Sequence, residues 1–253
     1  MPKIVSVHSF RGGTGKSNLT ANLAANVAMR GHRVGIVDTD IQSPGIHALF
    51  GLDEKRIGRC LNDYLWERCS VEDTAYDVSA SLDHRLTEGS AIYLVPSSIK
   101  SGDIARVLRE GYDVGRLNDG FQDLAARLRL DHLFIDTHPG LNEETLLSIA
   151  VSDLLILLMR PDRQDYQGTA VTVEVARKLE VPELLLVVNK VLATVDVAEL
   201  RQQVESAYRE PVAAVLPLSE DLVRMASSDL FSLREPDHAW SHEVRGIAER
   251  IVG

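Results

Sequence analysis

The chain has 253 residues, of which 45% are hydrophobic and 25% charged, and its formal net charge is −10. This length and composition are typical of a globular α/β protein with a sizeable core, and we predict a single domain over residues 1–253. The acidic balance argues against a protein whose whole surface binds nucleic acid.

The cysteines and the apolar runs limit the class of protein further. Only two cysteines occur, Cys60 and Cys69, and they do not form a C-x-x-C motif. The sequence therefore favours neither a disulfide framework nor a zinc or iron–sulfur site. No signal peptide is expected at the first residues, and no apolar run reaches the ~18 residues of a membrane span. We expect a cytoplasmic protein.

Short apolar runs recur along the chain with helical stretches between them. Because these runs lack polar alternation, we expect strands that are covered on both faces. The fold class predicted is α/β, a doubly wound, mostly parallel sheet with helices on both faces. The predicted strands cover residues 4–7, 34–37, 92–95, 133–135, 154–158, 184–188 and 212–216, and three of the helices cover residues 59–68, 117–130 and 241–252.

A glycine-rich segment lies between the first strand and a helical pattern. In this context the glycines let the backbone approach a polyphosphate, and a following lysine and serine are placed for phosphate and Mg²⁺. The sequence therefore predicts a phosphate-binding loop for a nucleoside triphosphate. The segment reads Phe10, Arg11, Gly12, Gly13, Thr14, Gly15, Lys16, Ser17, and we add Asn18 to the predicted nucleotide-binding residues.

Other polar residues follow predicted strands at the edge of the sheet where ligands bind in such folds. Asp38 and Asp40 leave the second strand, and Asp136 leaves the fourth. We expect Asp136 to hold Mg²⁺ through its water shell, although aspartates at strand ends also form turns. Asn189 follows a later strand, where its amide can pair with a nucleotide base, and Pro217 is expected to cover the base.

These landmarks together resemble the MinD/ParA family of P-loop ATPases. The loop is similar to the family's K-G-G-x-G-K-[ST], the run ending at Asp38 and Asp40 to its D-x-D strand, and the run from Asp136 to Gly140 to its D-x-x-P-G segment. The resemblance extends over nearly the whole chain, and it implies ATP and Mg²⁺ as ligands. One departure is Arg11, because the family has a lysine there.

The resemblance also implies roles for individual residues. Lys16 contacts the β- and γ-phosphates, Asp40 positions the attacking water, and Arg11 reaches the nucleotide of a second subunit as an arginine finger does. Asp38 supports the metal and the loop. His138 stands where the family has a small residue or proline, and we expect no catalytic role for it. The predicted catalytic residues are Lys16, Asp40 and Arg11, and the predicted metal-binding residues are Ser17, Asp38, Asp40 and Asp136.

By the same resemblance, we expect an ATP-hydrolysing switch that forms an ATP-dependent homodimer and is stimulated by a partner protein. The main hypothesis is that it positions a cargo, DNA or division machinery. Neither the charge nor the C-terminal sequence supports a DNA or membrane surface. The alternatives are an Mrp-like metallocluster carrier, suggested by residues 38–45 but opposed by the missing cysteine pairs, and a weakly hydrolysing scaffold.

Overall fold

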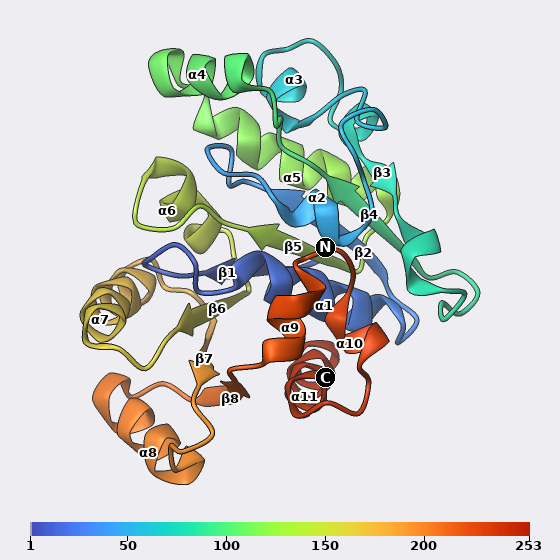
Figure 1. The fold of residues 1–253 in the computed structure, drawn as a ribbon. Coiled ribbons are helices and arrows are strands. Elements are labelled where there is room, and N and C mark those ends of the chain that lie inside the picture. Colours follow the sequence, from blue (N-terminus) through green and yellow to red (C-terminus); the bar gives the residue numbers. More distant parts are fainter. Residues whose placement is uncertain (1) are drawn as a thin grey trace.

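The computed structural model describes residues 2–253 and contains one eight-stranded sheet in the order β3-β4-β2-β5-β1-β6-β7-β8 (Figure 1). Neighbouring strands are parallel, except that β3 pairs antiparallel with β4. The predicted fold class is confirmed. The strands are β1 Lys3–His8, β2 Arg33–Asp38, β3 Tyr76–Asp77, β4 Ala91–Val95, β5 His132–Asp136, β6 Leu154–Met159, β7 Glu183–Val191 and β8 Val212–Pro217.

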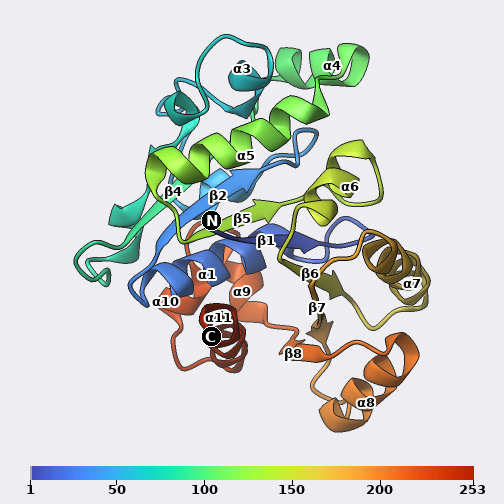
Figure 2. The same ribbon diagram turned by 180° about the vertical axis from the view of Figure 1, so that it is seen from behind.

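Helices cover both faces of the sheet, and Figure 2 shows the same two layers from behind. The helices α1, α10 and α11 lie on one face, and α5, α7 and α8 on the other. The helices are α1 Lys16–Ala28, α2 Ile46–Leu49, α3 Leu61–Leu65, α4 Ser101–Glu110, α5 Val114–Leu128, α6 Glu143–Ala150, α7 Arg163–Lys178, α8 Val197–Tyr208, α9 Glu220–Met225, α10 Phe231–Arg234 and α11 Ala239–Val252, with short 3-10 helices at Glu72–Thr74 and Ser79–Leu82.

All the strands predicted from apolar runs are present. The helix predicted over residues 117–130 is α5, which begins and ends earlier, and β7 extends to Val191, so Asn189 lies within this strand and not after it. Two further local features differ from the prediction. The helix predicted over residues 59–68 is the shorter α3. It begins after Cys60, whose backbone N–H donates to Asp63 Oδ2 at 3.2 Å, and it ends before Glu67, whose φ of 60° is left-handed. The strand β3 was missed because its two residues form no apolar run.

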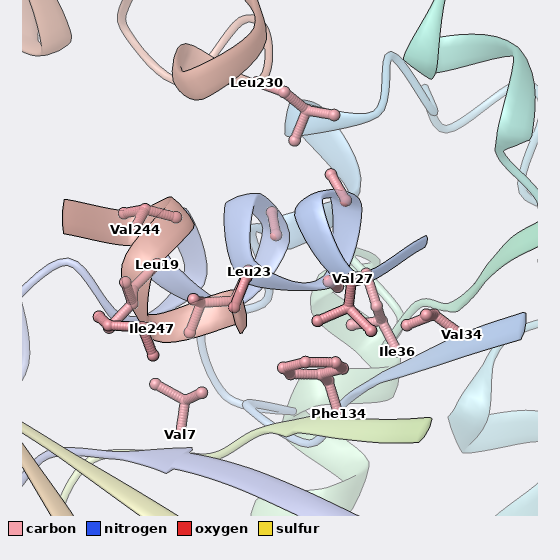
Figure 3. Close-up of a cluster of buried hydrophobic side chains, with 14 of the residues drawn as sticks. Val7, Leu19, Leu23, Val27, Val34, Ile36, Phe134, Leu230, Val244 and Ile247 are labelled. Atoms are coloured by element: carbon pink, nitrogen blue, oxygen red, sulfur yellow. The ribbon is translucent and has the colours of Figure 1, made fainter. Parts of the chain in front are cut away.

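In the larger core cluster, α1 and α11 pack against each other on one face of the sheet (Figure 3). Leu19, Leu23 and Val27 recur at a spacing of four, so they lie on one face of α1, and all three are fully buried. The apolar face of α11 packs against α1 through Val244 and Ile247. The C-terminal helix is therefore part of the fold, as predicted. Over residues 2–253 no helix is long and apolar enough to cross a membrane.

Phe134 gives a test of this core, because its fully buried ring lies between β5 and α1. We predict that Phe134→Ala lowers the free energy of unfolding by about 3–5 kcal/mol. The folded protein loses the hydrophobic burial of the ring, and the cavity that is left removes packing contacts. Urea denaturation followed by circular dichroism measures this. The matched control is Leu108→Ala, whose side chain is 62% exposed, and a change above about 0.5 kcal/mol there would contradict the assignment.

Candidate functional site

The glycine-rich loop connects β1 to α1 at the carboxyl edge of the sheet. Gly13 and Gly15 have φ values of 74° and 102°, which other residues adopt only with strain. A Cβ on Gly15 would lie 2.7 Å from Asn189 Nδ2. Gly15 caps α1 without any side-chain hydrogen bond to the helix. The first N–H groups of α1 therefore remain available to bind an anion.

Side chains hold this loop in place through hydrogen bonds. Ser9 Oγ donates to the Arg11 carbonyl at 2.7 Å, and Thr14 Oγ1 donates to Ser9 Oγ at 3.0 Å. Asn189 Nδ2 donates to the Thr14 carbonyl at 2.8 Å, and Lys190 Nζ donates to the Gly13 carbonyl at 2.7 Å. These bonds fix the loop before any ligand arrives, and preorganisation of this kind lowers the entropic cost of binding.

Two adjoining cavities follow the loop. One, of about 410 Å³, is lined by the loop and by Lys16, Ser17, Asp40 and Pro139. The other, of about 270 Å³, is lined by Asn18, Asn189 and Pro217 and by apolar side chains, and both cavities share Gly13, Gly15 and Asn18. The apolar residues of the second cavity are Leu218, Leu222, Val223 and Trp240.

The shape and chemistry of this pair of cavities match a nucleotide. A polar hollow on the glycine loop is suited to phosphates, and an apolar hollow with amide groups is suited to a base. Asn189 keeps one N–H and one oxygen lone pair for a base, because Nδ2 also donates to Thr14 and Oδ1 accepts from the Lys190 N–H at 2.9 Å.

Asp38 and Asp136 lie side by side, and Asp136 is close to Lys16 and Ser17, which line the larger of the two cavities. Asp38 and Asp136 are register partners on β2 and β5, and both are almost fully buried. Asp136 Oδ1 accepts from Thr20 Oγ1 at 3.3 Å and Asp38 Oδ1 accepts from the Asp40 N–H at 3.1 Å. The second oxygen of each carboxylate has no hydrogen-bond partner. Two orphaned buried oxygens at this place fit the water shell of a divalent cation.

Burial makes these carboxylates difficult to ionise. It raises the pKa of Asp136 to about 6, although the Lys16 ammonium and the hydroxyls of Ser17 and Thr20 act in the opposite direction. Burial, followed by the Asp136 and Asp40 carboxylates, raises the pKa of Asp38 well above its usual range. A cation bound above them would favour their ionised forms.

Among residues 2–253, no group of three or more His, Cys, Asp or Glu side chains is arranged to hold a metal ion. The predicted residues Ser17, Asp38, Asp40 and Asp136 therefore fit Mg²⁺ only together with phosphate and water ligands, which Mg²⁺ usually retains.

The predicted phosphate and interface cations have different surroundings. Lys16 is 7% exposed and lies inside the crevice. Arg11 is directed toward α7, where Nη1 lies 3.7 Å from Asp162 Oδ1 and 3.6 Å from Asp165 Oδ1. Its side chain is 41% exposed. Lys16 therefore lines the cavity at the glycine loop, whereas Arg11 does not.

Two histidines lie next to the site and were not predicted to contribute. His8 is fully buried at the end of β1, and its Nδ1 donates to Thr137 Oγ1 at 2.7 Å while this hydroxyl donates to the Val7 carbonyl. Burial lowers the pKa of His8 to about 3, so the ring is neutral. His138, expected on the surface, instead contacts Asp40.

Some of the contributing residues had a signal in the sequence, and others had none. Thr20 lies four residues after Lys16 and therefore on the same face of α1, so its approach to Asp136 was predictable from helix periodicity. His8 follows an apolar run without interruption and gave no signal. His138 was noticed only as a departure from the family pattern.

The comparisons with known proteins agree with this site. Residues 1–252 match the family model of the NUBPL iron-transfer P-loop NTPases. The chain belongs to this family. The fold is shared with the MinD/ParA ATPases, and the structure of the septum site-determining protein MinD from Pyrococcus horikoshii, complexed with Mg-ADP, superposes with a TM-score of 0.79 at 20% identity. That superposition covers 99% of this chain and 96% of the MinD chain.

Two proteins of known sequence are similar to this chain over most of its length. An uncharacterised ATP-binding protein of Methanocaldococcus jannaschii is 24% identical over 98% of this chain and 87% of its own length. The iron-sulfur cluster carrier protein of Methanococcus maripaludis is 28% identical over 73% of this chain. The alignment covers only 59% of that carrier.

The buried carboxylates generate a prediction on stability. Because Asp38 has a raised pKa in the folded protein, its contribution to stability is present at low pH and is lost as the pH rises through that pKa. We predict that Asp38→Asn stabilises the ligand-free protein by about 1–3 kcal/mol at pH 7.5, with little gain near pH 4. Thermal unfolding at both pH values measures this.

The control for this prediction is Asp237→Asn. Asp237 is exposed, and its substitution changes the net charge by the same amount as Asp38→Asn. A stability gain for Asp38→Asn that is the same at both pH values would contradict the role of the buried charge.

Proposed function

We propose that residues 1–253 form one ATPase domain that binds ATP with Mg²⁺ and hydrolyses it to control the assembly of two subunits. The observation that supports this most strongly is the pair of joined cavities, which are lined by the glycine loop, Lys16 and Asp40 on one side and by Asn189 and Pro217 on the other. Membership in a P-loop NTPase family supports nucleotide binding in general.

The triphosphate is held by the chain's own cations and amides. The amides of Gly12, Gly13, Thr14 and Gly15 and the Lys16 ammonium surround the phosphate oxygens, where they stabilise the charge that the transferred phosphoryl group carries. Asn18, Asn189 and Pro217 bind the nucleoside. Mg²⁺, when bound, neutralises phosphate charge and is held by the Ser17 hydroxyl and, through water, by Asp38 and Asp136.

Asp40 and Arg11 supply the remaining roles. Asp40 lines the phosphate cavity at the end of β2, where its carboxylate accepts a hydrogen bond from the attacking water and aligns it. The ion pairs of Arg11 are partly exposed and longer than 3.5 Å, and such pairs contribute at most about 1 kcal/mol. Arg11 can therefore leave them for a phosphate held by a second subunit.

The cargo of this switch is iron or an iron–sulfur cluster, and a partner protein mainly holds the cluster. The family description and the carrier relative favour this cargo over the positioning role. Cys60 is 5% exposed, and burial raises its pKa to about 11, so it is a poor metal ligand. Cys69 is half-buried, and burial raises its pKa as well.

The cargo hypothesis is tested by anaerobic reconstitution of the purified chain with ferrous iron and sulfide, followed by measurement of iron per chain. We expect less than stoichiometric iron on the chain alone, and co-purification of an iron-containing protein with the ATP-locked chain. A stoichiometric cluster that disappears in Cys69→Ser would contradict a partner-held cluster. Stimulation of ATP turnover by DNA or by lipid vesicles, without any iron-containing partner, would support the positioning role instead.

Lys16 gives the first test of the nucleotide site. We predict that Lys16→Ala weakens ATP binding at least about 100-fold, because a buried charge-assisted phosphate contact is removed. Isothermal titration calorimetry with a slowly hydrolysed ATP analogue measures the affinity. Lys178→Ala, on α7 outside both cavities, is the control, and unchanged affinity in Lys16→Ala would contradict the assignment.

Asp40 gives the test of hydrolysis. We predict that Asp40→Ala lowers the turnover of ATP at least about 100-fold while it leaves the affinity for ATP within about threefold, because the residue aligns water rather than holding phosphate. The ATP-saturated variant should sediment as a dimer in analytical ultracentrifugation. Wild-type turnover in Asp40→Ala, or a monomer at saturating ATP, would refute the corresponding part of the proposal.

A further inference from the structure

A histidine of the loop after β5 reaches across to the carboxylate that follows β2. His138 Nδ1 lies 2.8 Å from Asp40 Oδ1. Both side chains are largely buried, at 18% exposure for His138 and 13% for Asp40. The contact therefore joins two segments that are 98 residues apart in the sequence, each of which borders the phosphate cavity.

The chemistry of the pair fixes which atom carries the hydrogen. An ionised carboxylate only accepts hydrogen bonds, so His138 Nδ1 is the donor. Asp40 Oδ1 also accepts from the backbone N–H of Ser43 at 3.2 Å. Within residues 2–253 no hydrogen bond reaches Asp40 Oδ2. One oxygen is thus held by two donors, and the other is left free for a ligand or a water in the cavity.

The backbone on both sides of His138 is itself tied down. The His138 carbonyl accepts from Thr145 Oγ1 of α6 at 3.3 Å, and the N–H of Gly140 donates to the Ser9 carbonyl at 3.2 Å. The preceding Thr137 is fixed by His8. His138 is therefore anchored to α6 and to the start of the glycine loop, so the imidazole is a fixed donor rather than a mobile surface group.

We propose that His138 is a positioning residue that orients the Asp40 carboxylate for water alignment, and that it couples the loop after β5 to the loop after β2. This inference rests on the proposed ATPase function, because it assigns Asp40 to the attacking water. In the free side chain, rotation about the Cβ–Cγ bond exchanges the two oxygens and costs little. Two donors on Oδ1 remove that freedom, and orientation of this kind contributes to rate.

The proposal separates from a merely structural role by its kinetic signature. A positioning residue changes kcat and leaves ATP affinity unchanged, whereas a residue that only stabilises the loop changes both. The side-chain amide of asparagine places its nitrogen close to the position of a histidine Nδ1, so His138→Asn keeps a donor toward Asp40. His138→Ala removes it.

The experiment measures kcat, KM and analogue affinity for wild type, His138→Ala and His138→Asn. We expect kcat to fall at least about tenfold in the alanine variant, with ATP affinity within about twofold of wild type. The asparagine variant should recover kcat to within about threefold. Wild-type kcat in His138→Ala, or equal losses in the two variants, would overturn the proposal.

A double-mutant cycle and a ligand-free readout complete the test. In the Asp40→Asn background, His138→Ala should cause no further loss of kcat, because the partner carboxylate is already absent. Hydrogen exchange of the nucleotide-free chain should become faster over residues 40–45 in His138→Ala and stay unchanged over α8. Additive losses in the cycle, or unchanged exchange over residues 40–45, would contradict the contact.

The outcome also distinguishes this inference from the function on which it rests. A wild-type chain that binds ATP but never hydrolyses it would refute the proposed ATPase. The exchange measurement needs no nucleotide and would still decide whether His138 holds the segment that contains Asp40.

Discussion

The pair of buried carboxyl groups at the carboxyl edge of the sheet is the constraint on which the site depends. Asp38 and Asp136 are adjacent on parallel strands, are shielded from water, and each leaves one oxygen without a partner. Such an arrangement destabilises the ligand-free protein, because a buried carboxylate loses its hydration. The nearby Lys16 ammonium compensates only part of this cost, and a bound divalent cation would compensate more.

The glycine loop complements this charge from above. Gly13 and Gly15 of this loop have positive φ values, and the bonds from Asn189 and Lys190 hold the loop in that conformation. The carboxyl groups are suited to a metal ion, and the loop N–H groups and Lys16 are suited to phosphate. A metal-bound polyphosphate would therefore interact favourably with both sets of groups. The contact between His138 and Asp40 belongs to the same region, and it links two loops that border the same cavity.

Family membership and ligand inventory together narrow the biological role. The family is described as iron-transfer NTPases, yet Cys60 is buried, Cys69 is half-buried and no metal-binding cluster occurs in residues 2–253. The proposal that a partner protein holds the iron accounts for both findings. The apolar face of the C-terminal helix α11 packs against α1.

The sequence by itself determined the order of strands and helices, the loop and the main candidate residues. These features depend on local patterns: apolar runs for buried strands, four-residue spacing for Leu19 and Leu23, and adjacent glycines where the backbone must turn. The short β3 and the true length of α3 were not predictable, because neither has a pattern strong enough to outweigh its surroundings.

Only the tertiary structure decided which side chains meet. The pairing of His138 with Asp40, the approach of Asn189 to Thr14 and the ion pairs of Arg11 each join residues more than 90 positions apart. Such contacts follow from the order of the strands in the sheet, because strands that are distant in the sequence are neighbours there and their following loops meet at one edge. Local residue patterns do not determine that geometry, because the neighbours of a loop depend on the order of the strands in the sheet.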